Sequence, residues 1–141
     1  MRLVLAMLLM FSGYTFAGCA SISDSDQRAY CEAREKGSSC SYIHDSDLRS
    51  ACDAEVNGRS CSYIADTDQR DYCNAKKNGS SCSYIHNSDL RAACEAELKG
   101  YSCSYISDSD QRALCNAKQS GSSCSYISNS DLRNECEAMK R

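Results

Sequence analysis

The spacing of the cysteines constrains the fold of this chain more than any other feature of its 141 residues. The first three stand at Cys19, Cys31 and Cys40, and the separations of 12 and 9 residues then alternate without interruption as far as Cys136. A fixed period of 21 residues is typical of solenoids, in which each unit buries its apolar side against the next. The chain therefore divides into six units, at residues 19–39, 40–60, 61–81, 82–102, 103–123 and 124–141.

Twelve cysteines in so short a chain indicate a disulfide framework. Identical units should form identical bonds, which leaves two simple pairing schemes. Pairing across nine residues would leave Cys19 and Cys136 without partners, whereas pairing across twelve residues uses every thiol. We therefore predict one disulfide within each unit. The six predicted bonds are Cys19–Cys31, Cys40–Cys52, Cys61–Cys73, Cys82–Cys94, Cys103–Cys115 and Cys124–Cys136.

Each unit also carries the signals for one helix. An Asp or Asn that can accept hydrogen bonds from free backbone N–H groups stands at the expected start, as at Asp45. A second Asp follows two residues later, as at Asp47, where the helix dipole favours a negative charge. A glycine such as Gly58 stands where helices commonly end in the left-handed conformation. We predict a helix of about eleven or twelve residues in every unit.

The stretch Ser-Ser-Cys-Ser-Tyr-Ile between these helices allows two interpretations. It could form a short helical turn, which would make each unit an αα-hairpin, or a short strand, because Cys, Tyr and Ile suit pleated surfaces. We favour the helical turn, since the preceding Gly-Ser-Ser supplies both a helix end and a new N-cap. The predicted fold class is all-α: a short, disulfide-stapled α-solenoid of six 21-residue helical repeats. A strand-plus-helix solenoid is the alternative.

A second period of 42 residues lies over the first. Just before the second cysteine of each unit a large residue alternates with a small one, as Tyr30 does with Ala51, and three residues after that cysteine Arg34 alternates with Glu55. If the units stack side by side, these alternations favour a single register. Glu135 and Met139 break both patterns in the last unit, which predicts a polar cap at the end of an open array.

The first eighteen residues, 1–18, are predicted to be a signal peptide that precedes the repeat domain at 19–141. Arg2 supplies a positive charge, an apolar run too short to span a membrane follows, and Thr15-Phe16-Ala17 offers small residues to a signal peptidase. We therefore expect an exported protein, either periplasmic or secreted. Phe16-Ala17-Gly18-Cys19 also resembles a bacterial lipoprotein cleavage box. This resemblance implies, as the alternative, lipidation of Cys19 and a lipid anchor in the bacterial envelope, the one case in which we expect membrane contact.

Neither the charge nor the motifs indicate a cofactor. A net charge of −3 does not favour binding to nucleic acid. The chain has no Cys-x-x-Cys pair of the kind that zinc sites use, and its Asp-x-Asp pairs lack the longer acidic loop of a calcium site. His44 and His86 stand two units apart, too far to share a metal ion. The arginine that recurs in every unit, such as Arg49, is expected to pair with side chains four residues away. We therefore expect neither a metal nor a cofactor.

One tyrosine recurs in each unit from the second onwards. We expect this row mostly to pack between stacked units, with a possible second role as a binding surface, where tyrosine is favoured. The row consists of Tyr42, Tyr63, Tyr84, Tyr105 and Tyr126.

The working hypothesis is an exported, cysteine-rich repeat scaffold that binds a protein or polymer partner as a monomer. A structural or protective component of an envelope or matrix, without a specific ligand, is the alternative. We expect no enzymatic activity, because the chain lacks the short motifs in which reactive thiols usually stand.

Overall fold

The computed structural model describes residues 17–140 of the chain. Within this range every regular element is helical, which confirms the all-α repeat, and no helix is long and apolar enough to cross a membrane. The short helix α2 (Ala17–Ala20) is followed by α3 (Ser25–Lys36), α4 (Ser46–Asn57), α5 (Thr67–Asn78), α6 (Ser88–Lys99), α7 (Ser109–Ser120) and α8 (Ser130–Met139). Residues 1–16, which contain most of the predicted signal peptide, lie outside the described residues.

Short 3₁₀ turns join the six long helices. They are formed by the stretch for which the sequence allowed either a helical turn or a strand. They are η2 (Cys40–Tyr42), η3 (Cys61–Tyr63), η4 (Cys82–Tyr84), η5 (Cys103–Tyr105) and η6 (Cys124–Tyr126). The predicted helical interpretation is therefore confirmed for units two to six.

The ends of the long helices follow the predicted signals. The side chain of Asp45 accepts a hydrogen bond from the N–H of Leu48 at 2.8 Å, and an equivalent Asp or Asn caps each of the other five helices. Helices α3 to α7 each end at a glycine with φ between 71° and 73°, a conformation that L-residues with a side chain rarely adopt. Local sequence therefore determines where each helix begins and ends.

One disulfide and one isoleucine form the centre of every unit. The six disulfides are the pairs predicted from the twelve-residue spacing, with Cα–Cα distances of 5.6–5.9 Å. The isoleucine that follows each first cysteine by three residues is at most 1% exposed. The alanine two residues after each second cysteine packs against the cysteine and isoleucine of the next unit, as Ala54 does against Cys61 and Ile64. Each unit thus completes its neighbour's core.

The second Asp of each unit joins that unit to the next one, a role that helix-dipole reasoning did not predict. The two carboxylate oxygens of Asp47 accept hydrogen bonds from the backbone N–H groups of Ala65 and Asp66 at 2.8 and 3.0 Å. These two hydrogen bonds lower the pKa of Asp47.

The recurring arginine has a different role from the one expected. Nη1 of Arg49 donates to the carbonyl of Ile43 at 3.1 Å, and the same bond recurs in all six units in place of the expected pairing with side chains four residues away. The expectation of internal i,i+4 pairing was therefore wrong. The arginine instead satisfies the carbonyl that follows each turn.

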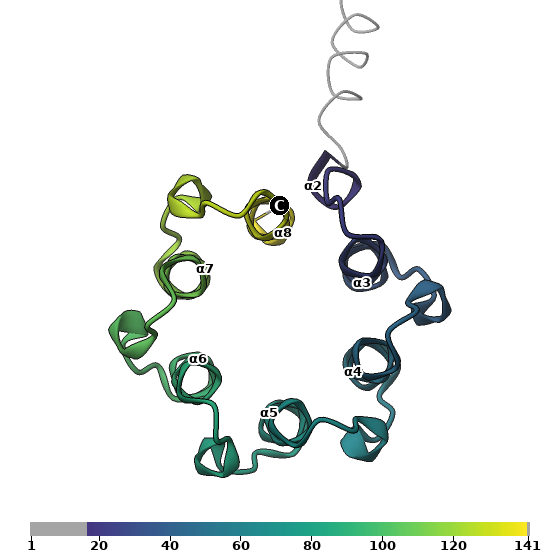
Figure 1. Cartoon of the computed structure of the whole chain (residues 1–141), viewed down its shortest axis with the longest axis horizontal. Helices are drawn as coiled ribbons and strands as arrows, with labels where there is room; N and C mark the ends of the chain where they lie inside the picture. Colours follow the sequence, from purple (N-terminus) through teal and green to yellow (C-terminus); the bar gives the residue numbers. More distant parts are fainter. Residues whose placement is uncertain (1–16, 141) are drawn as a thin grey trace, which may run out of the picture.

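The six units close into a ring (Figure 1). The last helix, α8, lies against α2 and α3 of the first unit. Across this closing junction Asp131 accepts hydrogen bonds from the N–H groups of Ser23 and Asp24 at 2.8 and 3.0 Å, the same pair of bonds that joins every other pair of units. Ala138 packs against Cys19 and Ile22, as the matching alanine does at the other junctions. The junction between units six and one therefore repeats the aspartate and alanine contacts of the other five.

The predicted polar cap on an open array was wrong. Glu135 does not end the array but forms an ion pair with Arg34 of the first unit at 3.5 Å. A Cβ atom on Gly18 would lie 2.7 Å from the Cβ of Ala138, which shows how closely the first and last units approach. The unusual residues of the last unit therefore belong to the closing junction.

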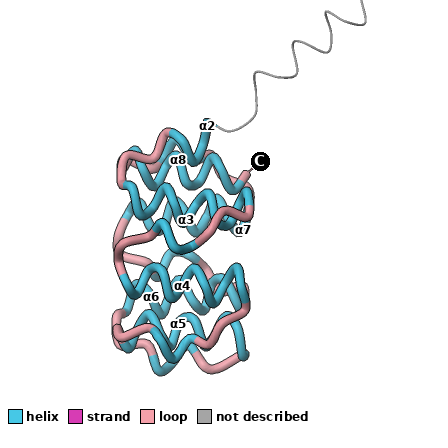
Figure 2. Tube along the Cα trace, turned by 90° about the vertical axis from the view of Figure 1, so that its right-hand side faces the viewer, coloured by secondary structure: helices cyan, strands magenta, loops and turns pink. Residues whose placement is uncertain are grey.

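The ring has two layers. The helices α3 to α8 form the inner layer, with their axes roughly along the axis of the ring, and the 3₁₀ turns form the outer layer (Figures 1 and 2). One pair of the predicted alternating charges forms an ion pair between neighbouring helices, in which Nζ of Lys76 lies 3.5 Å from Oε1 of Glu97.

Candidate binding surface

The tyrosine row is exposed on the turns that form the outer layer. Its five members, Tyr42, Tyr63, Tyr84, Tyr105 and Tyr126, are 65–76% exposed. The expectation that these rings mostly pack between units was wrong, because the isoleucines and disulfides fill that space. The first unit has Ser21 at this position, so the row is interrupted at the closing junction.

The geometry of the turn explains this exposure. In η3, Cys61 and Ile64 are both at most 2% exposed, and the N–H of Ile64 donates to the carbonyl of Cys61 at 3.1 Å. Residues three apart lie on the same side of a 3₁₀ helix, so Ser62 and Tyr63 face away from the core. Ser60 caps the turn by accepting a hydrogen bond from the N–H of Ser62 at 3.2 Å. Each unit therefore exposes its tyrosine through its own local structure.

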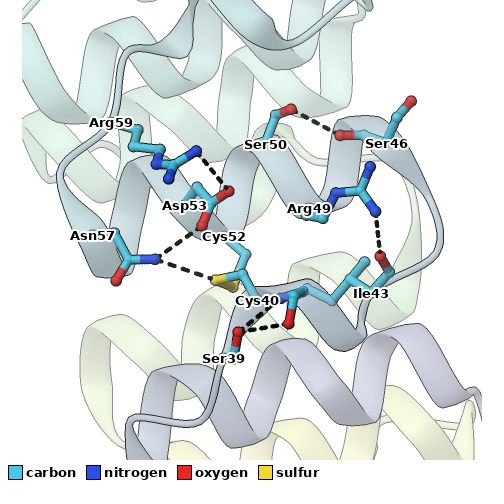
Figure 3. Close-up of polar contacts among 11 residues, drawn as sticks. Ser39, Cys40, Ile43, Ser46, Arg49, Ser50, Cys52, Asp53, Asn57 and Arg59 are labelled. Carbon is cyan, nitrogen blue, oxygen red and sulfur yellow. Dashed lines mark hydrogen bonds and ion pairs between the residues drawn. A yellow bond between two sulfur atoms is a disulfide. The ribbon is translucent and has the colours of Figure 1, made fainter.

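A groove of about 190 Å³ lies beside Tyr63, between α4 and η3. It is lined by Arg49, Ser50, Asp53, Arg59, Ser60 and Tyr63. Figure 3 shows the polar contacts around its α4 side. The carboxylate of Asp53 accepts a hydrogen bond from Nδ2 of Asn57 at 2.9 Å and lies 3.9 Å from the guanidinium of Arg59.

Three of the positions that line this groove differ from unit to unit, whereas the tyrosine, the arginine of the helix and the serine at Ser60 do not. The position of Asp53 holds Glu32, Asn74, Glu95 and Asn116 in the other units that precede a tyrosine turn. The position of Arg59 holds Ser38, Ser80, Tyr101 and Ser122. A constant tyrosine, arginine and serine are thus combined with three side chains that vary between units.

The inner faces of the helices enclose three further cavities of about 460–530 Å³ near the N-terminal ends of the helices. Each draws its lining from three successive helices, and one of them combines residues of α7, α8 and α3, which only a closed ring brings together. Leu48, Leu90 and Leu132 each contribute to one of these cavities, together with aspartates and glutamines. No basic side chain lines any of the three.

Further along the helices, two tyrosines, Tyr30 and Tyr72, contact the helices of the next units. Tyr30 donates a hydrogen bond to Glu55, and Tyr72 donates one to Glu97. Burial, followed by these hydrogen bonds, raises the pKa of both tyrosines well above the usual value. Between the two rings, over Ala51, lies a cavity of about 400 Å³. The alternation of large and small residues indicated this packing but not the hydrogen bonds.

The remaining candidate residues do not come together. His44 and His86 are each paired with an aspartate of the preceding unit, Asp26 and Asp68, at 3.0 and 3.2 Å. Within residues 17–140 no group of three or more His, Cys, Asp or Glu side chains could hold a metal ion. Cys19, the candidate for lipidation, is 4% exposed and forms a disulfide with Cys31.

Comparisons with known proteins give no relative: no family model, no curated protein and no solved structure matches the chain. The molecule is a cysteine-rich, disulfide-stapled helical repeat protein.

Proposed function

We propose that the protein is an exported, non-catalytic scaffold that binds a polymer or protein partner along the tyrosine row. Six disulfides indicate an oxidising environment, which supports export to the periplasm or to the outside of the cell. The bond between Cys19 and Cys31 supports the secreted form over the lipid-anchored one, because lipidation would need the thiol of Cys19.

The observation that carries this proposal is the exposure of five tyrosines at one repeated position. Large aromatic side chains are normally buried at least in part, and tyrosine contributes strongly to binding where it is held in a rigid frame. Here each tyrosine is the last residue of a capped turn whose cysteine is fixed by a disulfide. A preorganised surface of this kind loses little conformational entropy on binding.

A monomeric ring fits this proposal. An open solenoid can extend another copy end to end, but here the first and last units contact each other through Asp131, Ser23 and Asp24. Neither end is then available to a second copy. The outer layer carries the exposed tyrosines, so an extended partner would follow the circumference of the ring.

The test replaces all five tyrosines of the row by serine, the residue that the first unit already has at this position as Ser21. We expect the wild-type protein, purified after export, to bind at least one member of an array of extracellular polysaccharides and proteins. We expect the five-serine variant to lose that binding while keeping its circular dichroism spectrum and melting temperature. The serine of the first unit makes this a substitution that the repeat already tolerates.

The alternative, a structural or protective component without a specific ligand, makes the opposite prediction. If the wild-type protein binds no member of the array, or if the five-serine variant binds as well as the wild type, the tyrosine row is not a binding surface. A matched variant with Tyr30 and Tyr72 changed to Phe controls for the loss of tyrosine as such, since these two side chains face other helices. It should bind as the wild type does.

A further inference from the structure

The groove between α4 and η3 carries a second arginine that the equivalent positions of the other units lack. Arg49 and Arg59 both line it, and Asp53 is its one acidic side chain. The side chain of Arg59 is 68% exposed, and the guanidinium of Arg49 uses one donor for the carbonyl of Ile43, which leaves further N–H groups for a ligand. Two guanidinium groups against one carboxylate give the groove a net positive charge.

This second arginine is peculiar to one groove. The positions equivalent to Arg59 hold serine or tyrosine in the other units that precede a tyrosine turn. The aromatic ring and the helix arginine are the same beside all five tyrosine turns, and Arg59 is the one lining residue that adds a second positive charge. The unit repeats therefore supply four natural comparisons within the same molecule.

The lining combines one aromatic ring with five polar side chains and contains no aliphatic residue. An apolar peptide anchor would find no apolar pocket here, and such pockets are what protein hot spots use. A sugar ring instead offers a flat C–H face to an aromatic side chain and hydroxyl groups to serine, aspartate and arginine. A carboxylate on that sugar would match the fork of donors on a guanidinium.

We propose that this groove binds a uronic acid unit of an acidic polysaccharide, with the sugar ring against Tyr63 and its carboxylate bound by Arg59. Asp53, which accepts a hydrogen bond from Asn57, lies 3.9 Å from the guanidinium of Arg59 on one side and leaves its other N–H groups to a ligand (Figure 3). The serines Ser50 and Ser60 lie within the same lining and offer hydroxyl groups to the sugar. This inference rests on the proposed function and names the partner for one position of the tyrosine row.

The experiment measures binding of hexagalacturonic acid and of its fully methyl-esterified form to the exported protein by two-dimensional NMR titration. The ester keeps the sugar rings and removes only the negative charges. We expect the acid to bind several-fold more tightly than the ester, with the largest shift changes around Tyr63 and Arg59. Raising the salt concentration should weaken binding of the acid alone.

Two variants separate the contributions of the two side chains. Arg59→Ser copies the residue of the neighbouring units, so we expect an intact fold, about three- to tenfold weaker binding of the acid and unchanged binding of the ester. Tyr63→Ser should weaken both ligands about tenfold. Tyr105→Ser, the matched change in a groove without the second arginine, should leave the shift changes around Arg59 as they are.

Three results would overturn this inference. The first is an equal affinity for the acid and the ester, and the second is binding of the acid that does not depend on Arg59. The third is Arg59-dependent binding of hexaglutamate that is as tight as that of the acid, because hexaglutamate carries the charges without sugar rings. If both sugars bind through Tyr63 but not through Arg59, this inference fails while the proposed role of the tyrosine row stands. If the five-serine variant retains all binding, the proposed function itself fails.

Discussion

Removing one disulfide tests whether the array of units is closed, so that the last unit has two neighbours like the others. Each bond closes a loop with a sequence separation of 12 residues, and cross-linking a loop of this size stabilises a protein by about 3 kcal/mol through the unfolded state. For a chain of this length that corresponds to a fall in melting temperature of about 12 °C. Alanine is the suitable replacement for these cysteines, because a serine hydroxyl at the buried positions of Cys61, Cys124 and Cys136 would lack a hydrogen-bond partner.

The comparison is between the double variants Cys61→Ala/Cys73→Ala and Cys124→Ala/Cys136→Ala. In a closed ring units three and six each have two neighbours, so both variants should melt in one transition, lowered by a similar amount, when followed by circular dichroism at 222 nm. In an open array unit six would have one neighbour and would unfold separately. An early, separate transition in the second variant alone, or a loss of less than about 4 °C in both, would refute this reasoning.

Two further predictions concern the core and the junctions. Ile106→Ala removes most of a side chain that is 0% exposed, so we expect a loss of about 2–5 kcal/mol in the free energy of unfolding, against about 0.5–1.5 for Ile106→Val, measured by urea denaturation; equal effects would contradict the packing. Six aspartates at the junctions, Asp131 among them, have a pKa below their ordinary value of 3.8, so their stabilising effect is present above that pH and is lost as the pH falls further. The melting temperature should therefore stay level from pH 7 to 5 and fall below about pH 4, less steeply in Asp131→Asn; an equally steep fall in that variant would count against the junction bonds.

The elements of each unit could be predicted because their causes are local. Asp45 caps α4 by accepting a hydrogen bond from Leu48 three residues later, Gly58 ends the helix, and the twelve-residue spacing brings Cys40 to Cys52. The tyrosine row was misjudged because its direction depends on a single 3₁₀ turn. Burying Cys61 and Ile64 on one side of that turn leaves Tyr63 on the other.

Closure of the ring could not be predicted, because it depends on the angle between successive units. The contacts between units include the two hydrogen bonds that Asp47 accepts from backbone N–H groups of the next unit, to which the local pattern gives no clue. The rotations from unit to unit together bring Asp131 to Ser23 and Asp24. One feature of the sequence did indicate closure, because Glu135, which breaks the repeat pattern, forms an ion pair with Arg34 of the first unit.

The groove beside Tyr63 was missed for a related reason. Arg59 follows the glycine that ends α4, and Asp53 lies within that helix, so only the folded unit brings the two together. A comparison of the units with one another could have found it, because Arg59 stands where three other units have serine.

The most direct test of the closed ring is a measurement of nuclear Overhauser effects between methyl groups of the first and last units. Ala138 packs in one cluster with Ile22, as Ala33 does with Ile43 at the junction between units one and two. The closed ring predicts a cross-peak between the methyl groups of Ala138 and Ile22 of about the same intensity as that between Ala33 and Ile43. Observation of the Ala33–Ile43 cross-peak without the Ala138–Ile22 one would show an open array and contradict the account.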